Sequence, residues 1–510
     1  MAAPVILRSP TDLTLETLEE IAWEGRRLEL HADLLDHLGA THAQLCAALS
    51  FGEQVYGVTT GMGYLAGVAL SKDEQASHQA NLLLGRAVGG PPFLERGEAR
   101  ALLVARLASF LSGRTGITSS LCAFLVDRLN DGFVPAIPRS AIGCAGEIIP
   151  LAHAFGPLVG AGQILAEDGE VQDAAAGLAA RGAEPYQPAL KEGIALLAGA
   201  PGAVALAASA RRRGQVLSGQ LLMAAAFAID AMRAPLSPYD PAVAELANDP
   251  LMGDVLAQLD GLLHGSDPER RGGQAPVSFR VIPQVLTHLG RTLGRLEEDL
   301  RRALTAVGDS PALRDLPWES EPFISNGGFH AIGLASGLDS LCVALIQAVE
   351  LAGQQAHRLL DARFTGLPDQ LTSRPGPQAG LVAVQKRIAG ALNELRRLAA
   401  PATVGLSDTS MGQEDAMAFT FEAAEKLRRA ESLARDVLAC QLVICRQAWA
   451  LRGSPPADGL AECARVIATA VPPIDQDRPL GPDITGVRTL LASETLKWNT
   501  RLIDRSDPDP

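Results

Sequence analysis

Aromatic residues are scarce in this chain of 510 residues: only 4% are Phe, Trp or Tyr, although 47% are hydrophobic. A core must therefore be built mainly from Ala, Leu, Val and Ile, which favours closely packed helices over an aromatic-rich β-sandwich. Basic residues are outnumbered, and the formal net charge is −14. Such a charge helps solubility and argues against nucleic acid or an anionic membrane as a partner.

Cysteine is also sparse, and its spacing suggests no metal or redox site. The seven cysteines include no CxxC pair, and Cys440 and Cys445 fit neither a zinc site nor a redox motif. His31, His37 and His42 lie near one another, but no acidic or sulfur ligands accompany them at metal-site spacing. We expect reduced, mostly buried thiols and no bound metal.

Long apolar runs are missing as well. The most apolar one, residues 221–232, contains Asp230 and is too short to cross a bilayer. The N-terminus lacks the long apolar core of a signal peptide. We therefore expect a cytoplasmic protein without a membrane partner.

Helical periodicity dominates what is present. One leucine stripe, at three- and four-residue spacing, comprises Leu286, Leu289, Leu293, Leu296, Leu300 and Leu304. Further long helices are expected over residues 211–233, 331–361, 381–398 and 414–451, and shorter ones over 459–470 and 486–497. This pattern predicts a mainly α protein with an up-down helical bundle.

The first part of the chain is richer in loops. Helices are expected over residues 31–50, 75–88 and 96–130, the last interrupted near Gly113 and Gly116. No sharp boundary is visible, and the softest division falls near residue 205. We predict a loop-rich N-terminal domain over 1–205 and a helical bundle with a C-terminal helical cap over 206–510.

Residues 138–153, PRSAIGCAGEIIPLAH, stand out for their small side chains, which permit close backbone approach before an apolar helix begins. Taken alone, this is a helix-entry loop. The stretch resembles the signature of the histidine and aromatic amino-acid ammonia-lyases and aminomutases, approximately G-S-x-G-A-S-G-D-L-x-P-L-A-H. The matching residues are Gly143, Gly146, Pro150, Leu151, Ala152 and His153.

In that family the Ala-Ser-Gly tripeptide cyclises and dehydrates to the electrophilic cofactor 4-methylideneimidazole-5-one (MIO). Here the tripeptide is Cys144-Ala145-Gly146, and Ala145 has no hydroxyl to expel. The resemblance thus implies the histidine ammonia-lyase fold, with a long central helical bundle, but not the MIO cofactor, and we expect no cofactor.

The run YGVTTGMG, residues 56–63, resembles the family's inner loop, Y-G-x-x-T-G-F-G. The tyrosine of that loop is the catalytic acid or base at the substrate's β-carbon, which implies this role for Tyr56. Only four tyrosines occur in the chain, so one inside a glycine-rich loop is less readily explained as packing.

Arg86 falls where the family has a histidine that contacts the substrate side chain, in a helical L-S-H-A stretch. The resemblance implies that Arg86 faces the pocket and favours an anionic or hydrogen-bond-accepting substrate end. The alternative is an ordinary surface arginine.

QAPVSFRVIPQV, residues 274–285, resembles Q-D-x-Y-S-x-R-x-x-P-Q. The family arginine, matched by Arg280, holds the substrate carboxylate, and Gln284 also matches. The family tyrosine is replaced by Val277. A structural ion pair at a helix entry is the alternative role for Arg280.

Two later motifs complete the resemblance. NGGFHA, residues 326–331, resembles G-N-F-H-G and implies that Phe329 lies close to the cofactor loop; core packing is the alternative. GQEDAM, residues 412–417, resembles N-Q-E-D, so Gln413 and Glu414 match residues that contact the substrate's amine or ring. Glu414 could equally stabilise a helix N-terminus.

A further departure from the family pattern is Ala198, which stands where the family has an asparagine that supports the electrophile. Together with Ala145 and Val277, it falls on a position that makes or supports the electrophilic ring. One hypothesis is an enzyme that works without MIO, with Tyr56 and Glu414 as catalytic groups, on a carboxylate-bearing, amino-acid-like substrate in a lyase, Michael-addition or isomerisation step. A second is a non-catalytic homologue that binds a small acid or stabilises a partner subunit. A third is an ordinary ammonia-lyase inactivated by Ser-to-Ala at position 145. Relatives are homotetramers with each site built from three chains, so a homotetramer is expected.

Overall fold

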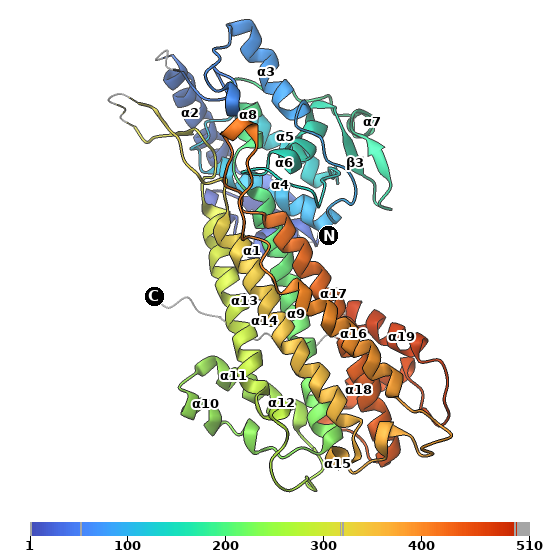
Figure 1. The fold of residues 1–510 in the computed structure, drawn as a ribbon. Helices are drawn as coiled ribbons and strands as arrows, with labels where there is room; N and C mark the ends of the chain where they lie inside the picture. Colours follow the sequence, from blue (N-terminus) through green and yellow to red (C-terminus); the bar gives the residue numbers. More distant parts are fainter. Residues whose placement is uncertain (1–2, 51–53, 317, 319–320, 494–495, 497–510) are drawn as a thin grey trace. The chain divides into compact units, whose positions relative to one another are not determined.

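Helices make up most of the computed structural model, which describes residues 3–50, 54–316, 318, 321–493 and 496. The strands in this part of the chain form short two-stranded sheets (Figure 1). Strand β1 (Val5–Leu7) pairs with β2 (Leu28–Leu30) in parallel. Strand β3 (Gln163–Leu165) pairs with β4 (Val171–Asp173) in antiparallel orientation. Strand β5 (Ala312–Leu313) pairs with β6 (Phe323–Ile324), also in antiparallel orientation. The prediction of a mainly α protein is confirmed.

Two compact units divide the chain, and each is assembled from separate segments. Unit 1 contains Met1–Ala210, Glu297–Leu338 and Ala402–Glu425, and unit 2 contains Arg211–Leu296, Asp339–Pro401 and Lys426–Pro510. The predicted boundary near residue 205 lies close to the first crossing between the units. Parts of the predicted second domain, 206–510, return to unit 1, because segments far apart in sequence pack together there.

Unit 1 is built around α4 (Arg96–Leu111), which is buried along most of its length. Arg100 of α4 donates to the backbone carbonyls of Ile21, Ala22 and Leu129, at the ends of α1 and α5. The other helices that carry the site and its support are α1 (Leu15–Ala22), α2 (Ala32–Leu49), α3 (Lys72–Leu84), α5 (Ser119–Asn130), α6 (Ile148–Phe155), α7 (Ala174–Ala179) and α8 (Glu192–Leu197).

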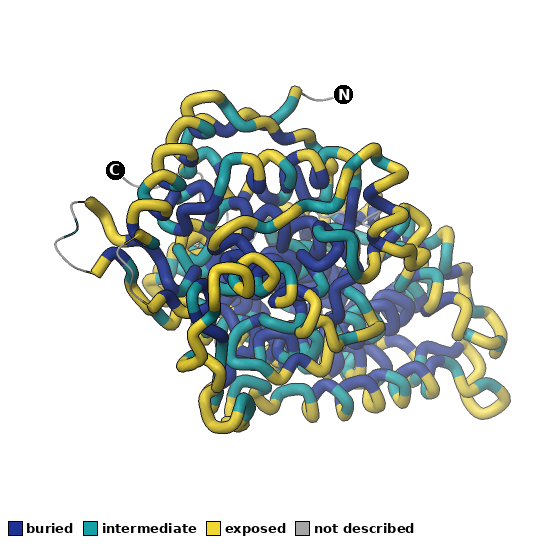
Figure 2. The backbone as a smooth tube through the Cα atoms, turned by 90° about the horizontal axis from the view of Figure 1, so that it is seen from above, coloured by how far each residue is buried: buried dark blue, intermediate teal, exposed yellow. Residues whose placement is uncertain are grey.

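Unit 2 takes its bundle from parts of α9 (Pro201–Met232), α13 (Ile282–Thr305), α14 (Ile332–Leu359) and α17 (Thr420–Arg452), and from α16 (Val382–Leu398). Phe227 and Trp449 pack with ring centroids 4.9 Å apart, which joins α9 to α17. Gln441 donates to Gln355 at 2.9 Å, which joins α17 to α14. Buried residues gather on the inner faces of the helices, and exposed ones lie on outer turns (Figure 2). The predicted bundle is confirmed.

Smaller helices complete unit 2. They are α10 (Ala242–Ala247), α11 (Pro250–Leu263), α12 (Val277–Arg280), α15 (Ala362–Thr365), α18 (Ala461–Ala470) and α19 (Gly481–Ala492).

Several predicted helix limits are wrong. The helix expected to start at residue 211 starts at Pro201, where proline suits the first helical turn. The helix expected from residue 414 begins at Thr420, because Phe419 has a φ of 50° and interrupts the helical backbone. The helix expected over 75–88 ends at Leu84, with the Gly85 amide bonded to the Asn81 carbonyl. The helix expected over 486–497 spans Gly481–Ala492, and α1 and α11 were not predicted.

The prediction that no apolar run is long enough to cross a bilayer is wrong, because two helical stretches in the described part of the chain are long and apolar enough by length and composition, Glu192–Met232 and Ile332–Leu359. In their most apolar windows, 89% and 61% of residues are buried inside the structure. Both are therefore core helices, and neither indicates a membrane.

Candidate active site

The glycine-rich loop before α6 is attached by two glutamates, Glu414 in the segment before α17 and Glu422 in the first turn of α17. Ile142 donates its backbone N–H to Glu422 Oε1 at 3.2 Å, and Ala145 donates to Glu414 Oε2 at 3.3 Å. Ala141 enters the loop with a φ of 63°, an unusual backbone conformation for a residue with a Cβ. These side-chain acceptors hold a strained turn that the local sequence alone would not stabilise.

The tripeptide at the loop's centre contains no hydroxyl. Ala145 presents a methyl group, and the Cys144 thiol donates to the Gly146 carbonyl at 3.1 Å. Burial raises the pKa of Cys144 to about 11, so it is a neutral thiol at pH 7. A ring that forms by loss of a serine hydroxyl does not fit these residues.

Tyr56 lines a cavity of about 320 Å³ in unit 1 together with Arg86, Cys144 and Glu414. The phenol oxygen accepts a hydrogen bond from the Gly63 N–H at 2.9 Å, within the same glycine-rich loop. The loop therefore positions its own tyrosine. Residues 56–88, 144–149 and 409–414 supply the walls, so the cavity brings together four of the sequence motifs, those of Tyr56, Arg86, Cys144 and Glu414.

Glu414 also lines this cavity, although it is far from Tyr56 in the sequence. Its Oε1 accepts the Ser410 hydroxyl at 2.8 Å, while Oε2 accepts the Ala145 amide. The carboxylate is thus oriented by two donors and joins the loop to the cavity wall. Glu414 lies ahead of α17 rather than in its first turn, so the alternative role as a helix-stabilising acid does not apply.

Arg86 lies in the turn after α3 and not on a helix, which corrects the helical position implied by the resemblance. Its Nη1 donates to the Leu82 carbonyl at 3.3 Å. Burial lowers the pKa of Arg86 below the usual arginine value, and the nearby Tyr56 and Glu414 oppose this effect. The guanidinium remains charged and faces the Tyr56 cavity, so it is not an ordinary surface arginine.

Phe329 lies against the loop, as the resemblance implies. A Cβ added to Gly146 would come within 3.4 Å of Phe329 Cβ. Phe329 also lines a second cavity of about 20 Å³ with Cys144, Ala145 and Glu422, large enough for about one water molecule.

Gln413 is exposed and is not among the residues that line the Tyr56 cavity. Its backbone N–H donates to the Ser410 carbonyl at 3.2 Å. Within one chain, the structure places Gln413 beside the cavity's supporting turn rather than in its wall.

Arg280 and Gln284 belong to unit 2, where both line a separate cavity of about 310 Å³. Arg280 ends the short helix α12, and its Nε donates to the Ala275 carbonyl at 3.0 Å. No carboxylate of the described residues lies within 4.0 Å of its guanidinium, so the structural ion pair offered as an alternative is absent. In a single chain, Arg280 and Tyr56 thus line different cavities.

Glu147, immediately after the tripeptide, is buried and joins the loop to α9. Its two carboxylate oxygens accept the backbone N–H groups of Gly202 and Ala203, each at 2.6 Å. These are first-turn amides of α9 that have no partner within the helix. Burial raises the pKa of Glu147 to about 7, although both amides and Arg106 favour the charged form.

Several supporting residues escaped the sequence analysis. Gln79 is buried and bridges the Gly57 carbonyl (3.0 Å) and the Ile194 amide (3.1 Å), which fixes the Tyr56 loop against α8. Ser410 and Glu422 lie outside any recognised motif, so no local signal marks them. Glu147 could have been noticed, because it directly follows the glycine-rich tripeptide.

Metal chemistry has no evident site in the parts of the chain that are described. No group of three or more His, Cys, Asp or Glu side chains there could hold a metal ion. His153 is used structurally: its Nε2 accepts the Gly89 amide at 2.9 Å, and burial lowers its pKa.

Comparison with known proteins agrees with this architecture. Histidine ammonia-lyase of Deinococcus radiodurans is 30% identical over 506 residues, which cover 98% of this chain and 96% of that protein. Tyrosine aminomutase of Streptomyces globisporus superposes with a TM-score of 0.87 at 26% identity, covering 98% of this chain and all of that one. An ergothioneine-degrading enzyme, ergothionase of Treponema denticola, solved with desmethyl-ergothioneine sulfonic acid, shares the fold with a TM-score of 0.91 at 22% identity; 97% of this chain and 99% of that one are covered.

The model of the aromatic amino acid lyase family matches residues 13–469, which include the glycine-rich loop and all the motifs that line the Tyr56 cavity. On this match, and on the identity to histidine ammonia-lyases along nearly the whole chain, the protein is an enzyme of the aromatic amino acid lyase family.

Proposed function

We propose that this enzyme is a carbon–nitrogen lyase that acts on a carboxylate-bearing, amino-acid-like substrate without the MIO electrophile. The observation that carries the proposal is that Ala145 has no hydroxyl to lose, while Tyr56 and Glu414, which match family residues, line one cavity together with Arg86, which stands in place of a family histidine. The family's proton-transfer tyrosine and carboxylate-binding arginine are kept, at Tyr56 and Arg280, while residues for building the electrophile are replaced.

Tyr56 is the proposed base at the substrate's β-carbon. The Gly63 N–H donates to its phenol oxygen at 2.9 Å, which fixes the position of that oxygen, and Arg86 lines the same cavity. The phenolate takes the β-proton, the C–H electron pair becomes the C=C bond, and the C–N pair leaves with the amine. An unsaturated acid and a free amine result, and the reverse sequence is a Michael addition.

Glu414 is the second proposed catalytic group. Its carboxylate is oriented by the Ser410 hydroxyl and the Ala145 amide, on the same cavity as Tyr56. A carboxylate there can hold the cationic amine before it leaves. Arg86 would bind an anionic or hydrogen-bond-accepting end of the substrate side chain.

Arg280 is the proposed anchor for the substrate carboxylate, with Gln284 beside it. Because Arg280 and Tyr56 line different cavities of one chain, this role requires a site completed by neighbouring chains, as in the homotetramers of the family. Gln413 and Phe329 would then complete the walls. Homotetrameric assembly and a cytoplasmic location remain proposals.

Without an electrophile, an ordinary ammonium group is a poor leaving group. The proposed substrate therefore has an unusually acidic β-proton or an amine that leaves more readily, such as a fully N-methylated one. A fold neighbour that degrades ergothioneine makes this compound worth including among the substrates to be tested.

The experiment is a screen of the purified enzyme against histidine, tyrosine, phenylalanine, their N-trimethylated forms and ergothioneine. Unsaturated acid is followed by its ultraviolet absorbance, and released amine by mass spectrometry. Tyr56→Phe should abolish turnover, whereas Tyr186→Phe should not, because Tyr186 bonds to Thr118 and Glu192 outside the cavity. Turnover that survives Tyr56→Phe undiminished contradicts the assigned base.

The other two hypotheses give different results. Carboxylate binding that needs Arg280 without any turnover points to a non-catalytic homologue. If Ala145→Ser alone produced a loss of water at residues 144–146 and ammonia release, the protein would be an inactivated conventional lyase.

A further inference from the structure

Another cavity of unit 1, distinct from the Tyr56 cavity and from the small one beside Phe329, has a volume of about 300 Å³. Its walls come from α4, from the starts of α9 and α14, and from the last turns of α13. Most of the lining is small and apolar, as at Ala105, Val204 and Leu334. The proposed lyase mechanism uses none of these residues.

Arg106 supplies a buried positive charge to this cavity. Its side chain is 1% exposed, and one terminal nitrogen, Nη2, donates to the Ala198 carbonyl. Its Nε has no hydrogen-bond partner, and no ion pair joins Arg106 to a carboxylate in the part of the chain described. Burial lowers the pKa of Arg106 to about 10, so the group is still a cation at pH 7.

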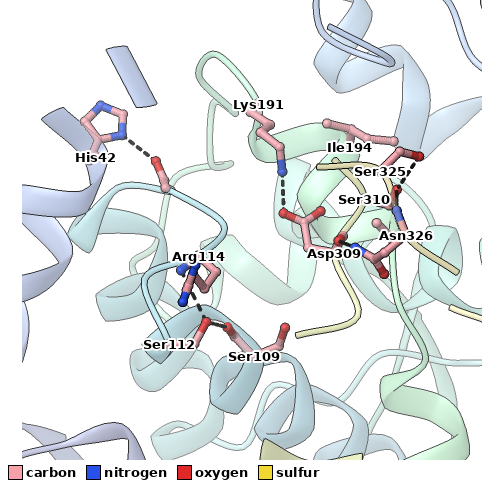
Figure 3. Close-up of polar contacts among 12 residues, drawn as sticks. His42, Ser109, Ser112, Arg114, Lys191, Ile194, Asp309, Ser310, Ser325 and Asn326 are labelled. Atoms are coloured by element: carbon pink, nitrogen blue, oxygen red, sulfur yellow. Dashed lines mark hydrogen bonds and ion pairs between the residues drawn. The ribbon is translucent and has the colours of Figure 1, made fainter. Parts of the chain in front are cut away.

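The carboxylates that attract Arg106 each bond to another group, and of their oxygens only Asp309 Oδ1 has no hydrogen-bond partner in the described part of the chain. Asp309 forms a fully buried ion pair with Lys191, which Figure 3 shows, and Glu147 accepts the two amides of α9. A buried cation without a close counter-ion is costly, because the protein interior replaces little of the lost hydration. An anion in the cavity would offset that cost.

Two further sets of donors face the same space. Ser109 lies one turn after Arg106 on α4, and its buried hydroxyl has no hydrogen-bond partner. The neighbouring Ser112 hydroxyl donates instead to the backbone carbonyl of Ser109 (Figure 3). Gly333 and Leu334, in the first turn of the 28-residue helix α14, also line the cavity. Among the described residues, no acceptor bonds to the backbone N–H groups of Gly333 and Leu334. At the start of α9, by contrast, the Glu147 carboxylate accepts such N–H groups.

We propose that this cavity is a binding site for a small carboxylic acid, held by the Arg106 guanidinium, the Ser109 hydroxyl and the N-terminus of α14. The volume corresponds to about ten water molecules at roughly 30 Å³ each, so the acid has room for a short apolar body against the alanine, valine and leucine side chains. Arg302 and Asp299 are paired with each other at 2.6 Å and line its exposed side, where the acid enters.

Benzoate is a suitable probe, and benzamide is its neutral counterpart. Titration calorimetry is carried out on full-length Arg280→Gln protein, so that the proposed carboxylate anchor of the lyase site does not contribute. Benzoate should bind with one site per chain, and benzamide should not bind detectably. Because the measurement needs no turnover, it fails or succeeds independently of the proposed lyase reaction.

Second substitutions in this background locate the site without removing Arg106, whose loss could unfold the protein. Ser109→Ala should weaken benzoate binding about three- to tenfold, as expected for one lost hydrogen bond. Ser112→Ala is the matched control and should not change it. Ala303→Leu, which fills the cavity from α13, should abolish binding.

The proposal is overturned if benzoate gives no binding heat, or if Ala303→Leu binds it as tightly as the parent protein. It is also overturned if inorganic phosphate displaces benzoate at equal concentration, because the cavity would then select charge alone. A crystal structure with benzoate that shows only water beside Arg106 would have the same consequence.

Discussion

The carboxylate of Glu147 accepts the backbone N–H of Gly202 at 2.6 Å, across 55 positions of sequence. This bond joins the glycine-rich loop to the first turn of α9, and the Ala203 amide repeats it on the other carboxylate oxygen. The position of the candidate site's central loop therefore depends on the start of a helix that sequence periodicity did not locate.

Gly202→Ala should destabilise the protein, because the new Cβ would lie 2.7 Å from Glu147 Oε2 and 2.9 Å from Phe421 Cζ. A loss of about 1 to 3 kcal/mol in the free energy of unfolding is expected from such overpacking. Urea denaturation measures it. Gly39→Ala in α2 is the control, since its Cβ would meet nothing within 4 Å, and it should stabilise by about 0.5 to 1 kcal/mol. Equal effects of the two substitutions would contradict the assigned clash.

Glu147 should also make stability depend on pH. Burial raises its folded-state pKa to about 7, above the unfolded value near 4.5, so the folded state binds more protons between these limits. The contribution is complete below about pH 4.5 and is lost as the pH rises through 7. Relative to Glu147→Gln, wild-type stability should fall by on the order of 2 to 3 kcal/mol between pH 4.5 and 7.5. Denaturation curves at several pH values test this, and a constant difference between the two proteins would show that Glu147 does not titrate in this range.

Glu414→Gln should reduce kcat about 10²- to 10⁴-fold on the substrate identified by screening, because it removes the charge of the proposed second catalytic group. The amide can still bond to Ser410 and Ala145, so the fold should be retained, and thermal melting verifies this. Asp415→Asn alters the exposed neighbouring acid and should leave kcat within twofold of wild type. Unchanged turnover in Glu414→Gln would remove this residue from the mechanism.

Tyr56→Phe and Arg280→Gln should complement each other if neighbouring chains complete each site. Each variant alone should be inactive, whereas co-expressed chains that mix randomly should recover about a quarter of wild-type turnover, because half of the chains supply each intact residue. The measurement is kcat per chain after co-purification through two different tags. Persistent inactivity in verified mixed oligomers would mean that both residues act from the same chain.

The motifs around Tyr56, Cys144, Arg280 and Glu414 were enough to predict the family and the mainly α fold, because their order and spacing are carried by the chain itself. Leucine periodicity likewise located α13 and α16, whose buried faces repeat at helical spacing. The missing hydroxyl at Ala145 is also a fact of sequence alone, and it underlies the proposal of chemistry without MIO.

Only the tertiary structure placed Glu414 against Ala145, Phe329 against Gly146, and Glu147 at the start of α9. These contacts join residues from 55 to 269 positions apart, and no local pattern encodes such pairings. The structure also shows that Arg86 lies outside a helix and that Arg106 lines a mostly apolar cavity. Local spacing determines which residues a helix face presents, but burial and charge compensation depend on which distant segments pack around them.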